Sequence, residues 1–370
     1  MRAVIFCHPD TAALEVAGLP LLDRLVVAAH RAGCETVQIV GLGNLPSLKR
    51  SRALGASFEI ATSVSGGGQP LLAMTSAVLV QASDIERVIV GNSRLVHKNG
   101  TLLPIGVIAN SGEADEIDGG SLPERFDKLD KIEATGVAIP VADNESARLA
   151  ENALWRSITS SSDGTVDAWF NRPIGRLFSK VLIRTAITPN QISVCATILG
   201  VFAGWLLAGG NYRDAICGAL LLQVSAIIDC VDGDVARIAF KETSIGKWLD
   251  IVGDQVVHIA VFVGLGVGLW RPEVGATVIG LAASASIGVI ISFIVVLRGM
   301  LLPKNRENVL LQKLIDKTTN RDFSVILLAL AIADQLTLFL WMVGIGVHLF
   351  WILALSVQLF SGPRKDGRAE

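Results

Sequence analysis

The sequence predicts two parts of different fold class: a soluble α/β domain followed by an all-α domain of six transmembrane helices. Hydrophobic residues make up 51% of the 370 residues and charged residues only 18%, whereas globular chains have roughly 25% charged residues. The apolar excess begins after Arg184. Before residue 150, patterns typical of strands and helices alternate, which favours an α/β domain.

The composition excludes several classes of protein. A disordered chain needs low hydrophobicity and a high net charge, and this chain has a mean hydropathy of +0.54 and a net charge of −2. The small net charge also argues against a nucleic-acid partner. The cysteines are scattered without the paired spacing of a metal site, so we expect reduced, buried thiols and no disulfides. They are Cys7, Cys34, Cys195, Cys217 and Cys230.

Apolar runs of strand length recur in the first part of the chain. They are Met1–Cys7, Glu35–Val40, Ser57–Ala61, Ser76–Ala82, Gly106–Asn110 and Ile132–Val141. Between the first two runs, Pro20–Ala32 has the apolar spacing of a helix. This alternation predicts a mostly parallel, Rossmann-type sheet covered on both faces. The first ten residues lack the apolar core and cleavage site of a signal peptide, so we expect them to start the first strand.

The second part contains long segments almost without charge. A spanning helix needs about 20 mostly apolar residues. We expect helices near residues 188–208, 214–239, 245–270, 274–298, 322–336 and 338–361, the fifth being short. Buried helices of a large soluble protein are a poor alternative, because too little polar surface remains to cover so much apolar chain.

Basic residues in the connections predict the orientation of these helices. The connections on one side carry only Arg213 and Arg271, and those on the other carry a long series of Lys and Arg. The positive-inside rule puts the basic side, both termini and the α/β domain in the cytoplasm of a bacterial or archaeal cell. The segment Asp167–Arg184 mixes large apolar residues with four basic ones. It is typical of an interfacial helix on the membrane, with an ordinary linker helix as the alternative.

Four aspartates are the most informative residues. Asp229 and Asp232 are three apart, and Asp250 and Asp254 are four apart, so each pair lies on one face of a helix. Both pairs lie at the cytoplasmic ends of consecutive spans, where they can face each other. Carboxylates in a membrane segment cost about 2.5–3.5 kcal/mol each on insertion scales, and a divalent cation removes that penalty and their mutual repulsion.

The type of ligand indicates the metal and the substrate. Oxygen ligands without Cys or His select Mg²⁺, Mn²⁺ or Ca²⁺. Mg²⁺ held by a few carboxylates usually completes its shell with water and substrate phosphates. Gly233 and Gly246 would let a phosphate approach the backbone, and Arg237 would be its bidentate partner. A single Asp would be a helix-end charge, but four at these spacings favour a metal site.

The spacing of these residues resembles the complete signature of the CDP-alcohol phosphotransferases. It runs Asp229-x2-Asp232-Gly233-x2-Ala236-Arg237-x8-Gly246-x3-Asp250-x3-Asp254. The similarity extends over about Asp163–Phe360 and includes Thr188–Asn190 before the first span. Asp163–Gly164 followed by Asn171–Arg172 is similar to the junction in archaeal bifunctional enzymes, which join an inositol-1-phosphate cytidylyltransferase domain to a di-myo-inositol phosphate phosphate synthase domain.

This resemblance implies transfer of a phosphoalcohol group from a CDP-alcohol to an acceptor hydroxyl, with release of CMP. The implied donor is of the CDP-diacylglycerol or CDP-inositol type, and the acceptor is a polar alcohol or alcohol phosphate. By similarity, Asp229, Asp232 and Asp250 bind one or two Mg²⁺ or Mn²⁺ ions, and Asp254 completes the metal site and serves as general base. The CDP part would be held by Asp229, Asp232, Gly233, Ala236, Arg237 and Gly246. A homodimer is expected.

Other basic residues are candidates for binding the acceptor. Arg298 ends the fourth span, and Lys317 and Arg321 precede the fifth. Positive-inside anchoring is an equally good explanation of all three. We interpret His258 and His348 as packed or hydrogen-bonded core residues rather than ligands.

The α/β domain is similar to sugar-phosphate nucleotidyltransferases. Val16–Val40 resembles their first βα unit, and Leu79–Asp84 resembles the strand end where they place a metal-binding Asp. After Ile5, however, there is no G-x-G-x-x-R loop, and the first lysine is Lys49. Without those donors and glycines the loop is a poor triphosphate cradle. We therefore expect a degenerate domain, with Asp84 as a helix cap.

Three functions stay open. The first is a membrane CDP-alcohol phosphotransferase with a degenerate α/β domain at 1–155, a linker and interfacial helix at 156–186 and the transferase domain at 187–362. The second is a bifunctional enzyme that also makes the CDP-alcohol from CTP, and the absent triphosphate loop argues against it. The third is a divalent-cation transporter, which would distribute acidic residues along a path through the bilayer instead of gathering them at one level.

Overall fold

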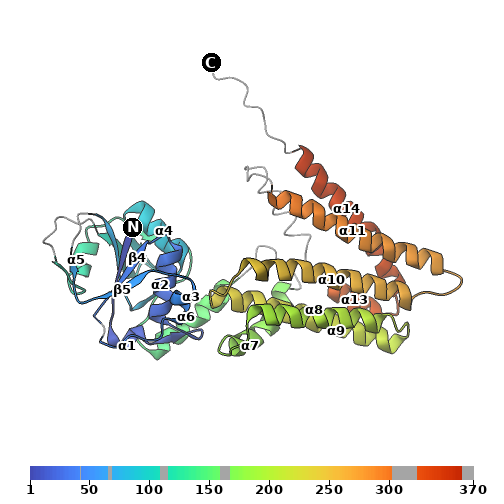
Figure 1. Ribbon diagram of the computed structural model, residues 1–370, viewed down its shortest axis with the longest axis horizontal. Helices are drawn as coiled ribbons and strands as arrows, with labels where there is room; N and C mark the ends of the chain where they lie inside the picture. Colours follow the sequence, from blue (N-terminus) through green and yellow to red (C-terminus); the bar gives the residue numbers. More distant parts are fainter. Residues whose placement is uncertain (42, 66–68, 109–115, 159–166, 302–322, 361–370) are drawn as a thin grey trace, which may run out of the picture. The chain divides into compact units, whose positions relative to one another are not determined.

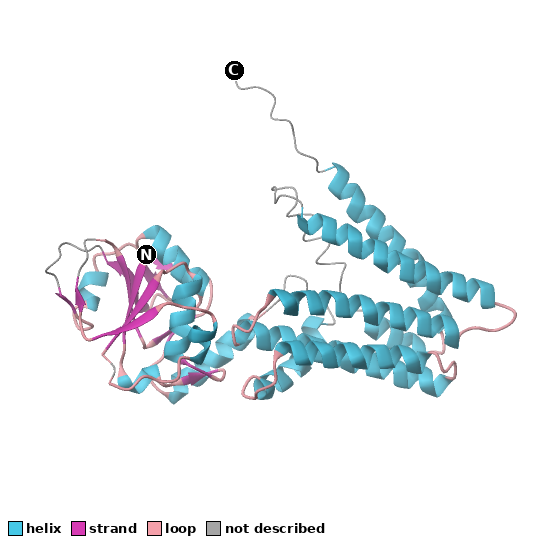
Figure 2. Cartoon of the chain, viewed as in Figure 1, coloured by secondary structure: helices cyan, strands magenta, loops and turns pink. Residues whose placement is uncertain are grey.

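The chain folds into two compact units in the computed structural model (Figure 1). The structure describes residues 1–41, 43–65, 69–108, 116–158, 167–301 and 323–360. The first unit comprises Met1–Ile158 together with Ile238–Phe240, and the second comprises Thr159–Arg237 and Lys241–Glu370. Among the described residues, every strand lies in the first unit, while the second is helical (Figure 2).

A seven-stranded sheet in the order β12-β9-β10-β7-β1-β4-β5 forms the first unit. Its strands are β1 (Arg2–Phe6), β4 (Thr36–Val40), β5 (Phe58–Ala61), β7 (Leu71–Thr75), β9 (Arg94–Val96), β10 (Leu102–Ile108) and β12 (Lys131–Glu133). Only β10 runs antiparallel to its neighbours among these strands. Three short pairs accompany the sheet: β2 (Glu15–Val16) with β3 (Leu19–Pro20), β6 (Val64–Ser65) with β11 (Glu116–Ile117), and β8 (Val78–Val80) with β13 (Ala138–Pro140).

Helices cover both faces of this sheet. On one face lie α2 (Leu21–Arg31) and α4 (Ala82–Gly91). The apolar face of α2 is fully buried, with Leu21, Leu22 and Leu25 among its residues. On the other face lies α5 (Leu122–Phe126), whose last residue packs with the apolar side chains of β1 and β7. The remaining helices are α1 (Pro9–Ala12), α3 (Lys49–Ala53) and α6 (Asn144–Ser157). The predicted α/β unit with a mostly parallel sheet is confirmed.

Two of the predicted strands are wrong in detail. Within the run Ser76–Ala82 the strand is only Val78–Val80 (β8), because Ser76 is buried at the turn after β7, where its hydroxyl accepts the amide of His8, and α4 begins at Ala82. The run Ile132–Val141 is divided into β12 and β13, because the amides of Thr135 and Gly136 donate to Asp84 instead of to a strand.

The second unit begins with a short π-helix, η1 (Asp167–Asn171), that continues into α7 (Arg172–Leu182). The longer helices are α8 (Pro189–Leu207), α9 (Tyr212–Ile238), α10 (Ser244–Gly268), α11 (Gly275–Leu301) and α14 (Leu336–Phe360). Within the described ranges these five are long and apolar enough to cross a membrane. The fifth predicted span corresponds to α13 (Phe323–Ile332), which has ten residues and is therefore about 15 Å long.

Threonines fix the start of two of these helices. The hydroxyl of Thr188 accepts the amide of Gln191, whose side chain accepts the amide of Thr188 in return. The hydroxyl of Thr243 likewise accepts the amide of Gly246 at the start of α10. Such caps satisfy amides that a helix start would otherwise leave unpaired inside an apolar bundle.

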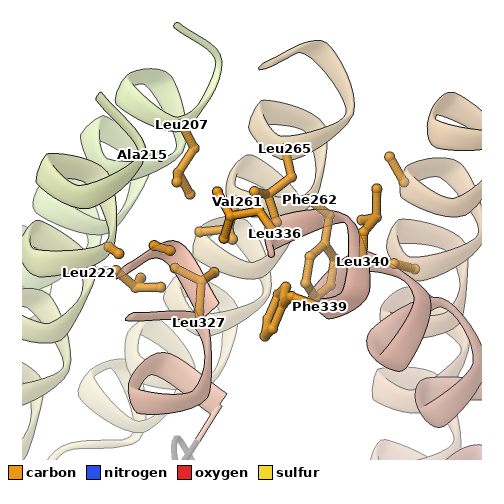
Figure 3. Packing of buried hydrophobic residues seen from close by; sticks show 14 of the residues in the cluster. Leu207, Ala215, Leu222, Val261, Phe262, Leu265, Leu327, Leu336, Phe339 and Leu340 are labelled. Carbon is orange, nitrogen blue, oxygen red and sulfur yellow. The ribbon is translucent and has the colours of Figure 1, made fainter. Parts of the chain in front are cut away.

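The core of the second unit is a buried apolar cluster drawn from α8, α9, α10, α11, α13 and α14 (Figure 3). It includes Leu207, Leu222, Val261, Leu327 and Phe339, each at most 3% exposed. The short helix α13 thus packs inside the bundle through Leu327.

The expectation of buried cysteines is wrong for two of the spans, since Cys195 and Cys217 are exposed on the helix surfaces; all five thiols are free.

Glycines bring α8 and α10 into backbone contact. A Cβ atom added at Gly264 would lie 2.0 Å from the carbonyl oxygen of Gly204, and one at Gly268 would lie 2.1 Å from that of Leu207. No side chain fits at these positions. Close approach through small residues is the usual way in which helices associate in lipid.

We predict that Gly264→Ala destabilises the helical unit by about 1–3 kcal/mol, because the added methyl group must push α8 away from α10. The measurement is the thermal unfolding midpoint of the detergent-solubilised protein. The matched control is Gly280→Ala on α11, where an added Cβ meets nothing within 4 Å. Alanine favours a helix over glycine, so the control should be neutral or stabilising. Equal midpoints for the two variants would contradict the close contact.

Candidate active site

The helices α9 and α10 carry the four predicted metal-binding aspartates. One carboxylate oxygen from each of Asp229, Asp250 and Asp254 lies within 4.8 Å of the others. Three carboxylates so close together repel one another unless a cation lies between them, and the donor set suits a hard divalent metal ion. The structure therefore brings together three of the four predicted ligands.

The fourth aspartate, Asp232, is held by a residue of α8 that the sequence prediction had not included in the site. Asp232 is 6% exposed, and its carboxylate accepts a hydrogen bond from the hydroxyl of Ser193 on α8. It lies outside the group of three that is within 4.8 Å. Ser193 thus sets the direction of the Asp232 carboxylate at the edge of the cluster.

Two further polar residues of α8 face the signature. A Cβ at Gly253 would lie 2.5 Å from Oγ1 of Thr197, and a Cβ at Gly246 would lie 2.8 Å from Oδ1 of Asn190. A side chain at position 246 would therefore displace Asn190 as well as crowd any ligand. The sequence feature that would have predicted this polar face is the spacing of Asn190, Ser193 and Thr197. It places three polar side chains on one face of an otherwise apolar helix.

Arg237 folds back over Gly233. A Cβ at Gly233 would lie 3.2 Å from Nη2 of Arg237, and the Arg237 side chain is 37% exposed. Ala236 is half-buried beside it. A larger residue at position 233 would thus crowd the guanidinium, which lies near Asp232 and Asp250.

A cavity opens from the aspartates into the helical bundle. Asp229 and Asp254 line it together with Thr197, Ser225 and Ser324. His258 also lines it and packs against Phe323, with 4.8 Å between the ring centroids. His348 lies elsewhere, between Ser284 and Trp351, at hydrogen-bond distances of 2.9 Å from each. Both histidines are packed among protein groups, as the sequence predicts.

Of the three predicted acceptor residues, the structure describes only Arg298. Arg298 is exposed near the end of α11. Lys317 and Arg321 lie outside the described residues.

In the first unit, Asp84 has a structural role. It is fully buried, and its carboxylate accepts hydrogen bonds from both amides of Thr135–Gly136 and from the Thr135 hydroxyl. The expected helix cap is wrong, because the carboxylate binds the amides of this distant loop and not those at the start of its own helix. Burial raises the pKa of Cys7 to about 12 and that of Cys34 to about 11, so neither thiol is a nucleophile at neutral pH.

The helical unit has recognisable relatives. Residues 186–357 match the sequence model of the family described as CDP-alcohol phosphatidyltransferase. This region belongs to that family. With five candidate spans, the protein is an integral membrane protein.

Several curated proteins are similar to the chain over part of its length. The bifunctional IPC transferase and DIPP synthase of Aquifex aeolicus is 36% identical over 104 residues, which cover 28% of this chain and 23% of that protein. The protein of the same name from Rubrobacter xylanophilus is 30% identical over 34% of this chain and 28% of its own length. The archaetidylinositol phosphate synthase of Pyrococcus horikoshii is 27% identical over 26% of this chain and 50% of its own. The matches thus span half or less of each relative.

Solved structures of phosphatidylinositol phosphate synthase from Mycobacterium tuberculosis are also similar. The form with CDP-DAG bound is 17% identical, with a TM-score of 0.39 over 54% of this chain and 99% of that one. The complex with manganese and citrate is 16% identical, with a TM-score of 0.38 over 53% of this chain and 93% of that one.

We predict that Ser193→Ala weakens Mn²⁺ binding about tenfold, because loss of a hydrogen bond that orients a ligand typically lowers metal affinity 10–100-fold. Binding is measured by titration of the solubilised protein. The control is Ser286→Ala on α11, whose hydroxyl donates to the carbonyl of Ala282 one turn back at 2.8 Å. If both variants bind Mn²⁺ like the wild type, Ser193 does not orient a ligand.

Proposed function

We propose that the protein is a metal-dependent CDP-alcohol phosphotransferase of the membrane. It transfers the phosphoalcohol group of a CDP-alcohol, of the phosphatidyl or phosphoinositol type, to an acceptor hydroxyl and releases CMP. The observation that carries this proposal is the meeting of Asp229, Asp250 and Asp254 within 4.8 Å inside the region that matches the family.

The metal site suits Mg²⁺ or Mn²⁺. Its donors are carboxylate oxygens, as these ions prefer, and Asp229, Asp232, Asp250 and Asp254 would hold one or two ions. A bound ion would neutralise the aspartates and stabilise charge on the pyrophosphate of the donor. Arg237 would bind a phosphate oxygen, with Gly233, Ala236 and Gly246 leaving room for the CDP part.

Asp254 is the proposed general base. The oxygen of the acceptor hydroxyl attacks the β-phosphorus of the CDP-alcohol, the bond from that phosphorus to the CMP oxygen breaks, and the hydroxyl proton passes to the Asp254 carboxylate. Both Asp254 and Asp229 line the cavity next to the cluster. An acceptor that enters there would meet the base and the metal ligands together.

The substrates are proposed from the relatives. Their names refer to inositol phosphate or phosphatidylinositol chemistry, which favours an inositol-type alcohol on one of the two substrates. CDP-diacylglycerol and CDP-inositol are the donors to compare. Arg298, Lys317 and Arg321 remain candidates for an acceptor phosphate.

The first unit is proposed to be a degenerate, Rossmann-type nucleotidyltransferase-like domain at 1–155. The loop after β1 starts Cys7-His8-Pro9-Asp10 and offers no glycine or lysine to a triphosphate. Synthesis of the CDP-alcohol by this unit is therefore the second candidate function, favoured by the bifunctional names of four relatives.

We further propose the membrane arrangement. Six spans, with α13 as the fifth, would leave both termini in the cytoplasm of a bacterial or archaeal cell. Residues 156–186 would form the linker and interfacial helix, and 187–362 the transferase domain, as a homodimer. The exposed apolar side chains of η1 and α7 support this, among them Trp169 at 83% and Leu177 at 67% exposure.

We predict that Asp254→Asn lowers CMP release at least a thousandfold while CDP still binds, because the amide cannot take the proton of the acceptor. The assay offers CDP-diacylglycerol and CDP-inositol in parallel to solubilised protein with Mg²⁺ and a panel of alcohols. General-base catalysis alone contributes roughly 10²–10⁴-fold, and this residue also binds metal. Turnover at the wild-type rate would remove Asp254 from its assigned role.

Asp229→Asn should have a different effect on binding and turnover. The loss of one carboxylate from the cluster should weaken Mn²⁺ and CDP binding together, so higher Mg²⁺ should recover part of the CMP release. Titrations of both ligands and the Mg²⁺ dependence of turnover measure this. Unchanged affinity for both ligands would show that Asp229 is not a ligand.

A further inference from the structure

A fifth aspartate lies within the signature, at a position that the family spacing leaves open. Asp234 is fully buried on α9. One of its oxygens, Oδ1, lies 2.7 Å from Nη1 of Arg172 and 3.4 Å from Nη2 of Arg237. A single carboxylate oxygen therefore interacts with a guanidinium from α7 and with the guanidinium of the proposed phosphate-binding residue.

Arg172 is fixed in place by the packing of α7 on α9. Arg172 itself is 6% exposed. A Cβ at Gly175 would lie 3.3 Å from the carbonyl oxygen of Ile227, so the two helices touch at the backbone. Next to Arg172, the side chain of Asn171 accepts a hydrogen bond from Gln223 of α9. The Arg172–Asp234 pair is thus part of a close helix contact.

Arg237 lies near more than one carboxylate. It lies near enough to Asp232 and Asp250 to interact electrostatically with both. An arginine that paired fully with those residues would neutralise the charges that attract a metal ion. The carboxylate of Asp234 offers a competing partner, with Oδ1 3.4 Å from Nη2 of Arg237.

We propose that Asp234, anchored by Arg172, is a positioning residue that holds Arg237 beside the metal-binding aspartates and keeps it from pairing with them. Metal ion and donor phosphate can then bind at the same time. This inference rests on the proposed function and explains why a buried charge is kept at an open position of the signature. Breaking a buried pair by removing one partner leaves an uncompensated charge, here on Arg172, and frees Arg237.

The test is Mn²⁺ and CDP binding to the full-length, solubilised protein. Asp234→Asn should weaken Mn²⁺ binding about tenfold, because Arg237 then competes for Asp232 and Asp250. CDP affinity should fall at low Mn²⁺ and recover at saturating Mn²⁺, which displaces the arginine. A general packing defect would not be reversed by metal. The matched control is Lys180→Gln on the exposed side of α7, which should bind both ligands like the wild type.

A second-site variant separates positioning from folding. In the double variant Asp234→Asn, Arg237→Gln, the competitor is gone, so Mn²⁺ affinity should return to within about twofold of the wild type although CDP binding stays weak. Arg172→Lys keeps a charge but not the guanidinium geometry and should shift Mn²⁺ affinity two- to threefold in the same direction. It is the variant to use if Asp234→Asn does not fold.

The outcomes are distinct. Unchanged Mn²⁺ affinity in Asp234→Asn, or a loss that Arg237→Gln does not reverse, overturns the inference. If the wild type binds Mn²⁺ and CDP but releases no CMP, the proposed reaction fails, and the positioning role is still judged by the affinities. A wild type that binds neither ligand overturns both.

Discussion

The backbone contact between α8 and α10 is the constraint on which the candidate site depends. Because Gly204, Gly264 and Gly268 carry no side chains, the two helices approach until carbonyl oxygens meet Cα atoms. At that separation the polar face of α8 reaches the signature, and Ser193 can hydrogen-bond to Asp232. A wider spacing would leave Asp232 without this donor in an apolar bundle, where an unsatisfied polar group is costly.

Charge balance is the second organising feature. The bundle holds several carboxylates near one another: Asp232 and Asp234 are buried, and Asp229, Asp250 and Asp254 are half-buried. Arg172 and Arg237 compensate Asp234, whereas Asp229, Asp250 and Asp254 gather around one point. The site thus divides its acids between one that pairs with arginines and a group arranged for a cation.

The sequence allowed prediction of much of the fold and of the central acids. Apolar runs of strand length predicted β1, β4 and β5, and long apolar segments predicted the five long helices. Such segments can be recognised because the local composition and spacing of apolar residues reflect their burial. The spacing of Asp250 and Asp254 predicted a shared helix face. Neighbours across the bundle were not predictable: Arg172 meets Asp234 at a separation of 62 residues, and the position of Ser193 opposite Asp232 depends on how closely α8 and α10 pack.

The packing of α7 against α9 also fixes the level of α7 relative to the metal-binding aspartates. Gly175 touches α9 at Ile227, Cys230 and Val231, which is the level of Asp229 and Asp232, while the opposite side of η1 and α7 exposes Trp169, Phe178 and Val181. A helix with such a side suits the boundary between lipid and water, which is where we propose that it lies. A lipid-linked donor could then react while its acyl chains stayed in the membrane. The supply of donor would depend on its lateral diffusion and on its mole fraction in the leaflet. A polar acceptor would instead arrive by diffusion from the aqueous phase.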